Sequence, residues 1–208
     1  MTQLYIEDCL ETLKRDIEYD YVVTSPPDFN ELTGDSKTNL SYTDFLESFV
    51  KELNPKGDFA SICISDRKSG GQIISKHSMV IDVFKSLGWG LHTHKIWVKS
   101  TGIDMFRLNY QHLLTFSRKK QTRPLITDFK PDVFVINQSK WNNYSYGMPV
   151  RIIELLVNNY TDIGDTVYDP FMGSGTTAEA CVNTNRKWKG TEISKKYAQM
   201  TIDRTESL

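Results

Sequence analysis

The stretch YDPFMGSGTT, residues 168–177, decides the fold, because it joins an apolar strand to a helix through two closely spaced glycines. Gly173 and Gly175 permit a tight turn and leave the backbone open to close approach by a ligand. Thr176 and Thr177 then begin a helix whose first N–H groups face the same crevice. The pattern therefore indicates a ligand site at the carboxyl end of a strand in an α/β sheet.

A second strand, 188–191, ends in Glu192, about twenty residues after the first glycine. An acid at the end of the second strand of a βαβ unit accepts hydrogen bonds from the two hydroxyls of a ribose, so Glu192 is a candidate nucleoside ligand. The alternative is that Glu192 only caps the next helix. Ala178 stands where a third glycine of a dinucleotide fingerprint belongs, which disfavours a pyrophosphate site, and no Gly-Lys-Ser/Thr follows to make a Walker loop.

A further polar motif, TSPPDF at 24–29, follows the apolar strand 21–24. The two prolines fix their own φ angles and hold Ser25 in an extended conformation, so the carbonyls here point in fixed directions. If the Ser25 hydroxyl and the Pro26 carbonyl accept the two N–H bonds of an exocyclic amine, the nitrogen lone pair turns toward an electrophile. The alternative is a Pro-Pro turn after a strand.

Outward from these motifs, short apolar runs alternate with segments of helical period, as in an α/β protein with a parallel sheet. The expected strands are 4–6, 21–24, 59–64, 91–98, 113–116, 167–168 and 188–191. The expected helices are 9–15, 42–53, 75–87, 150–160, 176–182 and 195–204. Residues 118–147 carry no clear period and are expected to leave the sheet.

The 208 residues, 39% hydrophobic and 25% charged, suit one soluble domain, which we expect to span 1–208. The three cysteines are too few and too scattered for a disulfide framework or a zinc motif. The amino terminus lacks the order of a signal peptide, and no apolar run is long enough to span a bilayer. We therefore expect a cytoplasmic protein, in a bacterium or a phage-infected host cell, with no membrane partner.

Charge is unevenly distributed although the net charge is only −1. Residues 85–130 hold nine basic and two acidic side chains, a net of +7 that the rest of the chain balances. This window and the loop 66–71 are the expected places of nucleic-acid contact, although a solvated charged face is the alternative. The expected DNA contacts are Arg67, Lys68, Arg107, Arg118, Lys119, Lys120 and Arg123.

Taken together, the two motifs resemble those of the S-adenosylmethionine-dependent amino-methyltransferases of DNA, in the β-type order in which the catalytic motif precedes the cofactor loop. The segments that carry the resemblance are 4–11, 24–27, 148–150, 169–177 and 190–193. The resemblance implies a Rossmann-like class I methyltransferase fold: a mostly parallel twisted sheet with helices on both faces and a circularly permuted motif order. It covers nearly the whole chain and leaves about 118–147 as a small target-recognition excursion.

The resemblance also implies which residues bind the cofactor and which bind the target base. Those expected to hold S-adenosylmethionine are Asp8, Cys9, Thr24, Met148, Pro149, Asp169, Pro170, Phe171, Gly173, Ser174, Gly175, Thr176, Thr177 and Glu192. Those expected to orient the amine and line the base pocket are Ser25, Pro26, Pro27, Asp28 and Phe29. Members of the family usually carry an aromatic residue directly after Pro-Pro, where this chain has Asp28.

The implied reaction is direct methyl transfer to an exocyclic amino group of a base flipped out of duplex DNA, or of single-stranded DNA. No cysteine follows a proline, which disfavours covalent methylation at carbon 5 of cytosine. Ser25 at the first motif position favours N4 of cytosine over N6 of adenine. The further alternatives are an inactive module that binds S-adenosylmethionine and nucleic acid, and an RNA methyltransferase.

The remaining expectations concern target recognition, biological role and metal binding. With about thirty residues left for target recognition, we expect short or relaxed sequence specificity, or recognition shared across a homodimer. A role in restriction-modification is compatible with the sequence. His92 and His94 are spaced like neighbours on one strand face, but no carboxylate cluster accompanies them, so no metal is expected.

Overall fold

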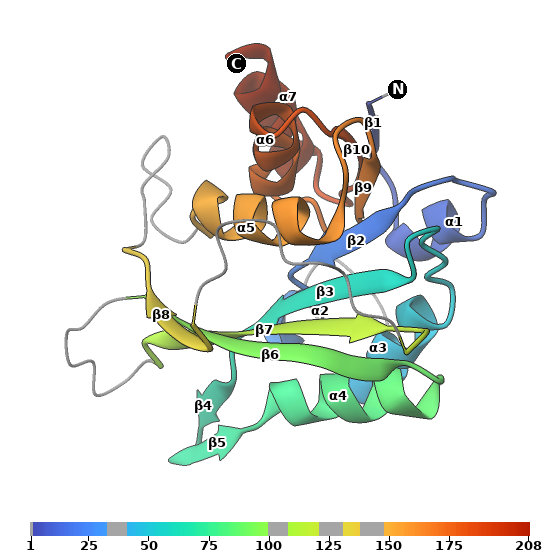
Figure 1. Ribbon diagram of the computed structural model, residues 1–208. Coiled ribbons are helices and arrows are strands. Elements are labelled where there is room, and N and C mark those ends of the chain that lie inside the picture. The colour runs from blue at the N-terminus through green and yellow to red at the C-terminus, as the bar shows by residue number, and fades with distance from the viewer. Residues whose placement is uncertain (1, 33–40, 100–107, 121–130, 138–147) are drawn as a thin grey trace.

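The computed structural model describes residues 2–32, 41–99, 108–120, 131–137 and 148–208. Its centre is an eight-stranded sheet with the order β1-β10-β9-β2-β3-β7-β6-β8 (Figure 1). The strands of this sheet are β1 (Gln3–Tyr5), β2 (Tyr21–Thr24), β3 (Phe59–Ile64), β6 (Gly90–Val98), β7 (Tyr110–Ser117), β8 (Val133–Val135), β9 (Thr166–Asp169) and β10 (Lys187–Thr191). Every pairing is parallel except the two made by β7, so the predicted mostly parallel sheet is confirmed.

Helices cover both faces of this sheet (Figure 1). They are α1 (Cys9–Leu13), α2 (Phe29–Leu32), α3 (Tyr42–Val50), α4 (Lys76–Ser86), α5 (Val150–Tyr160), α6 (Thr176–Asn183) and α7 (Lys195–Glu206). One hydrophobic cluster joins the sheet to α1, α3 and α4, and a second joins it to α5 and α6. Within the described ranges, none of these helices is long and apolar enough to cross a bilayer.

The two central strands, β2 and β3, are buried on both faces of the sheet. All side chains of β2 and β3 are buried, because helices cover both faces of the parallel sheet at this point. Such strands read as continuous apolar runs rather than as alternating ones. The register places Thr24 of β2 beside Ile62 of β3, and Tyr21 beside Phe59. The carboxyl ends of β2, β3, β9 and β10 therefore meet at one edge of the sheet, where an open α/β sheet binds its ligands.

Three features differ from the sequence-based expectations. The prediction that 118–147 leaves the sheet is wrong for β8, which pairs in parallel with β6 at the sheet edge. The expected loop 66–71 is a hairpin of β4 (Arg67–Ser69) and β5 (Gln72–Ile74). Its turn residues Gly70 and Gly71 both have positive φ, the conformation of a tight two-residue hairpin turn. Residues 29–32 form the short helix α2, which is not among the expected helices.

Candidate active site

A cavity of about 630 Å³ opens at the carboxyl edge of the sheet. Residues that follow β2, β9 and β10 line it, together with residues that follow β1. It contains most of the predicted site residues, namely Asp8, Cys9, Thr24, Ser25, Pro26, Pro27, Met148, Asp169, Pro170, Phe171, Gly173, Ser174, Thr176, Thr177 and Glu192. Both sequence motifs therefore face one cavity, although about 140 residues separate them along the chain.

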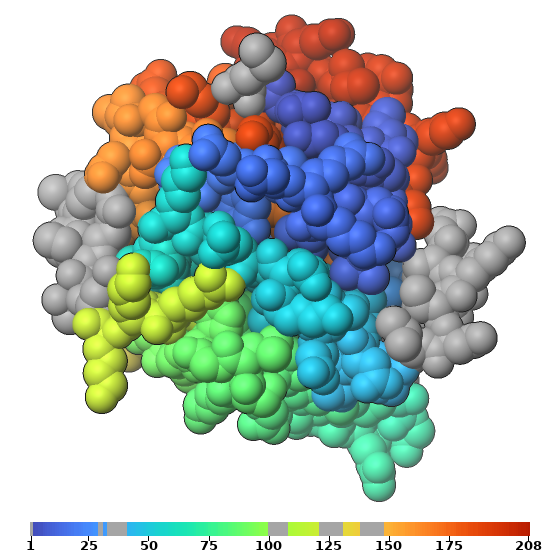
Figure 2. Space-filling model, turned by 90° about the vertical axis from the view of Figure 1, so that its right-hand side faces the viewer, coloured from blue at the N-terminus to red at the C-terminus, as the bar shows by residue number. Residues whose placement is uncertain are grey.

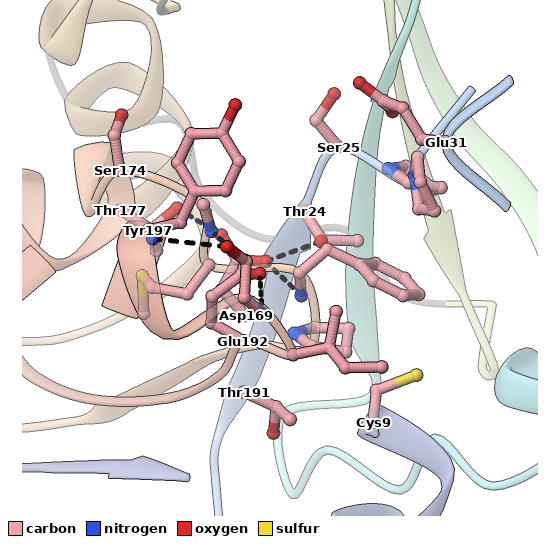
Figure 3. Close-up of a pocket in the computed structure, with 18 of the residues that line it drawn as sticks. Cys9, Thr24, Ser25, Glu31, Asp169, Ser174, Thr177, Thr191, Glu192 and Tyr197 are labelled. Carbon is pink, nitrogen blue, oxygen red and sulfur yellow. Dashed lines mark hydrogen bonds between the residues drawn. The ribbon is translucent and has the colours of Figure 1, made fainter. Parts of the chain in front are cut away.

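Asp169 joins the two motifs at the base of this cavity (Figure 3). Its carboxylate oxygens accept hydrogen bonds from the hydroxyls of Thr24, at 2.5 Å, and Thr177, at 2.6 Å. The backbone N–H of Phe171 donates a third, at 3.0 Å. Burial raises the pKa of Asp169 to about 6, although these three donors favour the ionised form and oppose the increase. Thr24, which was expected to touch the cofactor, thus also fastens the end of β2 to the end of β9.

The glycine turn is held in place by α7, a contact that the sequence motifs did not reveal. Thr201 donates a hydrogen bond from Oγ1 to the Gly173 carbonyl at 3.0 Å. Arg204, which is buried, donates to the Ser174 carbonyl and to the Thr176 hydroxyl, both at 3.1 Å, and its guanidinium also pairs with Glu179. The glycine turn is therefore fixed from behind before any ligand binds in front of it.

Gly175 shows why a side chain is excluded at this turn. Its φ is +83°, which L residues rarely adopt, and it directly precedes the first residue of α6. A Cβ added there would lie 2.9 Å from the Cα of Thr201. Gly175 is therefore required for close packing of α7 against the turn, and it is not among the residues that line the cavity.

Glu192 uses both carboxylate oxygens to hold backbone N–H groups. Oε2 accepts from Gly173 and Oε1 accepts from Ser194, each at 2.8 Å. Burial raises the pKa of Glu192 above its ordinary value, while these backbone donors oppose the increase. Glu192 therefore holds the N-cap residue of α7, whereas the Ser194 side chain itself caps that helix. Because a carboxylate has about four acceptor positions, room remains for hydroxyls of a ligand in the cavity.

The wall that follows β1 contributes one charged and one thiol side chain. Asp8 accepts a hydrogen bond from the backbone N–H of Leu10 at 2.9 Å and so caps the amino terminus of α1. Cys9 is buried, and burial raises its thiol pKa well above the ordinary range. The same holds for Cys63 and Cys181. None of the three cysteines is therefore a ready thiolate nucleophile.

The Ser-Pro-Pro motif lies on the opposite side of the cavity from Ser174 and Tyr197 (Figure 3). Ser25 is exposed at the end of β2, whereas Pro26 is buried. The hydroxyl of Tyr42 donates to the Pro27 carbonyl at 3.2 Å. This carbonyl already has a partner, which leaves Ser25 and the Pro26 carbonyl as the motif's candidate amine acceptors.

Asp28 departs from its predicted role in the base pocket. Its carboxylate lies 3.1 Å from Nζ of Lys76, and its Oδ1 lies 3.7 Å from a guanidinium nitrogen of Arg67. Lys76 is only 4% exposed, so this pair is well shielded from water. Asp28 is absent from the cavity lining because these two cations hold it against α4 and β4. Phe29 begins α2, but its side chain lies outside the described part of the structure.

Several cavity residues were not among the predicted site residues, and most of them lie outside the quoted motifs. They come from separate parts of the chain and are Glu7, Glu31, Leu32, Phe45, Gln111, Ile153, Met172, Thr191, Ile193, Ser194 and Tyr197. Glu31 lies beside Ser25 in Figure 3 and accepts a hydrogen bond from the backbone N–H of Asp28 at 2.6 Å. Pro149, which was predicted to touch the cofactor, instead caps α5 just outside the cavity, while its neighbour Met148 lines it.

The predicted DNA contacts fall into two separate groups. Arg67 and Lys68 lie on β4, near Asp28 and the carboxyl edge of the sheet. Arg118 and Lys119 follow β7, whose last residue pairs with Phe59 at the opposite end of β3. From the rise per residue, the length of β7 separates the two ends by about 23 Å. The two groups therefore do not form one continuous basic face, and Arg107 and Arg123 lie outside the described residues.

Side-chain contacts also engage the second group (Figure 2, yellow-green segment). Arg118 donates to Asn54 and to the Leu53 carbonyl, and its guanidinium stacks over the ring of Trp89, 4.6 Å from the centroid. Lys119 pairs with Asp58 at 2.6 Å. Lys120 is exposed beside them. Arg118 and Lys119 thus have structural contacts at an edge remote from Ser25.

Comparison with known proteins identifies the family of this chain. Residues 19–203 match the N6/N4 family model, described as DNA methylase. The type II methyltransferase M.BglII of Bacillus subtilis is 24% identical over 226 residues, which cover 89% of this chain and 63% of that protein. The chain spans less than two thirds of the length of the first curated relatives it matches.

Solved structures share the architecture. The PvuII DNA methyltransferase, described as cytosine-N4-specific, is 21% identical with a TM-score of 0.81, over 98% of this chain and 87% of that one. A DNA modification methylase of Thermus thermophilus, solved with S-adenosyl-L-methionine, is 21% identical with a TM-score of 0.77, over 100% of this chain and 94% of that one. These similarities confirm the predicted Rossmann-like class I methyltransferase fold.

Proposed function

Because the chain belongs to the N6/N4 DNA methylase family, we propose that it transfers a methyl group from S-adenosylmethionine to an exocyclic amino group of DNA. The observation that carries the proposal is the Thr24–Asp169 hydrogen bond of 2.5 Å. It joins the end of the Ser-Pro-Pro strand to the end of the strand that leads into the glycine turn. An amine held at Ser25 and a cofactor held at the glycine turn would therefore share one cavity.

The cavity has the size and polarity that such a cofactor needs. Its volume of about 630 Å³ is within the usual range for small-molecule and cofactor sites. In the proposed arrangement Glu192 accepts the ribose hydroxyls, Asp8 lies on the adenosine side, and the turn 173–175 approaches the methionine portion. S-adenosylmethionine, when bound, supplies an electrophilic methyl group.

Ser25 and the Pro26 carbonyl would orient the target amine. Amino groups on a nucleobase are weak nucleophiles, because the nitrogen lone pair is conjugated with the ring. Two acceptors in fixed positions draw both N–H bonds to one side, which turns the lone pair toward the methyl donor. The buried Pro26 and the Tyr42 hydrogen bond on Pro27 keep these acceptors rigid. A duplex substrate must present its base flipped out, because the amine is otherwise buried in the stack.

We favour N4 of cytosine as the target atom. Ser25 at the first motif position supports this choice, as does the structural similarity to a methyltransferase described as cytosine-N4-specific. N6 of adenine is the alternative within the same chemistry. Methylation of carbon 5 is disfavoured because it needs a thiolate nucleophile, and burial keeps all three cysteines in the thiol form.

The test compares variants of the Ser-Pro-Pro motif with a matched serine on α4. Ser25→Ala should lower turnover ten- to a hundredfold while the dissociation constant of S-adenosylmethionine changes little, because the hydroxyl acts on the amine and not on the cofactor. Ser86→Ala, at the far end of α4, should leave both quantities unchanged. If Ser25→Ala methylates DNA at the wild-type rate, the proposed role of the motif is wrong.

Substrate choice separates the remaining alternatives. Labelled S-adenosylmethionine is supplied with duplex DNA, single-stranded DNA and RNA in parallel. The proposal predicts transfer to DNA. Transfer to RNA alone would identify an RNA methyltransferase, and tight cofactor binding without transfer to any of the three would identify an inactive binding module.

A further inference from the structure

Three side chains on the α4 face of the sheet bring metal-ligating atoms together. Asp66 follows β3, His77 lies in the first turn of α4, and His112 lies on β7. The ligand atoms of these residues all lie within 4.8 Å of one another. The His77 Nδ1 atom lies 2.8 Å from the Asp66 carboxylate, and His112 Nε2 lies 3.4 Å from Asp66 Oδ2. Three separate segments thus converge on one point.

One ligand atom in this group has no hydrogen bond to any described residue, although a carboxylate lies near it. His112 is 6% exposed and Asp66 is 8% exposed, so both are removed from water. Within the part of the chain that the structure describes, His112 Nε2 is buried without a hydrogen bond. Leaving a buried polar atom unpaired costs free energy, and buried nitrogens normally have a partner. Nε2 faces the Asp66 carboxylate, so a cation between them would satisfy both groups.

His94 fixes the orientation of the His112 ring. His94 Nε2 lies 2.9 Å from His112 Nδ1, the second ring nitrogen. When His112 Nδ1 carries the proton and donates to His94, the lone pair of Nε2 is free for a ligand. Metal-bound histidines usually have such an outer partner, which sets their tautomer and position.

The sequence did not reveal this group because a bulge separates the two histidines of β6. The register of β6 against β7 shifts between Leu91 and Thr93. His92 consequently contacts the rings of Phe59 and Tyr160 on the α5 side, whereas His94 turns to the other face. The carboxylate that the pattern lacked is Asp66, from a different part of the chain.

We propose that Asp66, His77 and His112 bind one divalent transition-metal ion such as Zn²⁺, with His94 as the outer partner of His112. Two imidazoles and one carboxylate suit zinc, whereas magnesium and calcium prefer oxygen ligands alone. In a tetrahedral zinc site ligand atoms lie about 3.3 Å apart, and the observed separations of 2.8 and 3.4 Å are close to that. The proposed fourth ligand is a water, which solvent supplies past the His77 side chain because that side chain is 24% exposed.

Such an ion would link the loop after β3, the start of α4 and β7. Lys76, which pairs with Asp28, directly precedes His77, and Arg67 directly follows Asp66. The site would therefore stabilise the segment that flanks the Ser-Pro-Pro motif without touching the reaction itself. The competing explanation is a simple ion pair in which Asp66 caps α4, since its Oδ1 also accepts the backbone N–H of His77 at 3.1 Å.

The test is metal binding to protein without an affinity tag, after removal of bound ions with a chelator. Calorimetric titration with Zn²⁺ should give one ion per chain, and Co²⁺ should give visible absorption bands of a nitrogen- and oxygen-ligated site. His77→Gln and His112→Gln should each weaken Zn²⁺ binding at least tenfold. His92→Gln is the matched control, since His92 lies on the other face, and should bind as the wild type does.

Circular dichroism of each chelated variant shows whether it is folded, and melting temperature gives a second measure of binding. At the same Zn²⁺ concentration, the melting temperature of the wild type and of His92→Gln should rise by more than that of the other two variants. The proposal is overturned if the wild type binds no stoichiometric ion, or if His77→Gln and His112→Gln bind it as tightly. Neither measurement uses methyl transfer, so failure here is distinguishable from failure of the proposed function.

Discussion

At the scale of single residues, Asp169 carries an unusual electrostatic cost. Burial raises its pKa from 3.8 to about 6, so the folded protein keeps this proton to a higher pH than the unfolded chain does. Stability from this group is therefore greatest below about pH 4, is lost as pH rises toward 6, and then levels off. The shift corresponds to at most about 3 kcal/mol.

The pH dependence is tested by comparing the wild type with Asp169→Asn, which lacks the titrating group. Urea unfolding at a series of pH values should show that the stability of the wild type relative to Asp169→Asn falls as pH rises from 4 to 6. Groups common to both proteins cancel in this difference. Parallel stability curves over that range would show that Asp169 does not titrate as described.

A second prediction at this scale concerns Glu192. Glu192→Gln keeps the size of the side chain but removes its charge and one acceptor oxygen. Hydrogen bonds to a charged group contribute roughly 1.5–3 kcal/mol, so S-adenosylmethionine should bind about ten- to a hundredfold more weakly by calorimetry. Glu11→Gln, on the exposed surface of α1, is the control. Equal affinity in Glu192→Gln and the wild type would remove Glu192 from the cofactor site.

At the scale of elements, the contact between α7 and the glycine turn holds one wall of the cavity in place. Gly175 and Gly164 both have positive φ, at +83° and +90°, but only at Gly175 would a Cβ collide with a neighbour, Thr201. Gly164→Ala should cost about 1 kcal/mol of unfolding free energy from backbone strain alone. Gly175→Ala should cost about 2–4 kcal/mol, because overpacking is added, and should weaken cofactor binding. Equal losses in urea unfolding would show that α7 yields without cost.

Some helices and strands were predictable from the sequence and others were not. The apolar runs of β2 and β3 and the periodic α5 were predictable, because burial on both faces or on one helical face leaves a period in the chain. The three-residue strand β8 was not, since three residues are too few to establish a period and only Phe134 among them is buried. Arg204 behind Ser174 and Lys76 beside Asp28 were also missed, because tertiary packing alone joins them.

At the scale of the whole molecule, the basic residues predicted to contact DNA lie in two groups, at opposite ends of the strands of the sheet. Of the predicted DNA contacts that the structure describes, only Arg67 and Lys68 lie near the carboxyl edge of the sheet. Lys68→Gln should therefore reduce the slope of log affinity against log salt by about 0.9, the loss of one phosphate contact. Lys119→Gln, whose lysine pairs with Asp58, should leave that slope unchanged. The reverse result would place the nucleic acid at the opposite edge.

The central claim is that this fold brings an amine-orienting Ser-Pro-Pro motif to an S-adenosylmethionine cavity. It is tested most directly by digesting DNA treated with the protein and labelled cofactor to nucleosides, then separating them by liquid chromatography and identifying them by mass spectrometry. We predict label in N4-methylcytosine, with N6-methyladenine as the product if adenine is the target. Label found only in 5-methylcytosine would contradict the account.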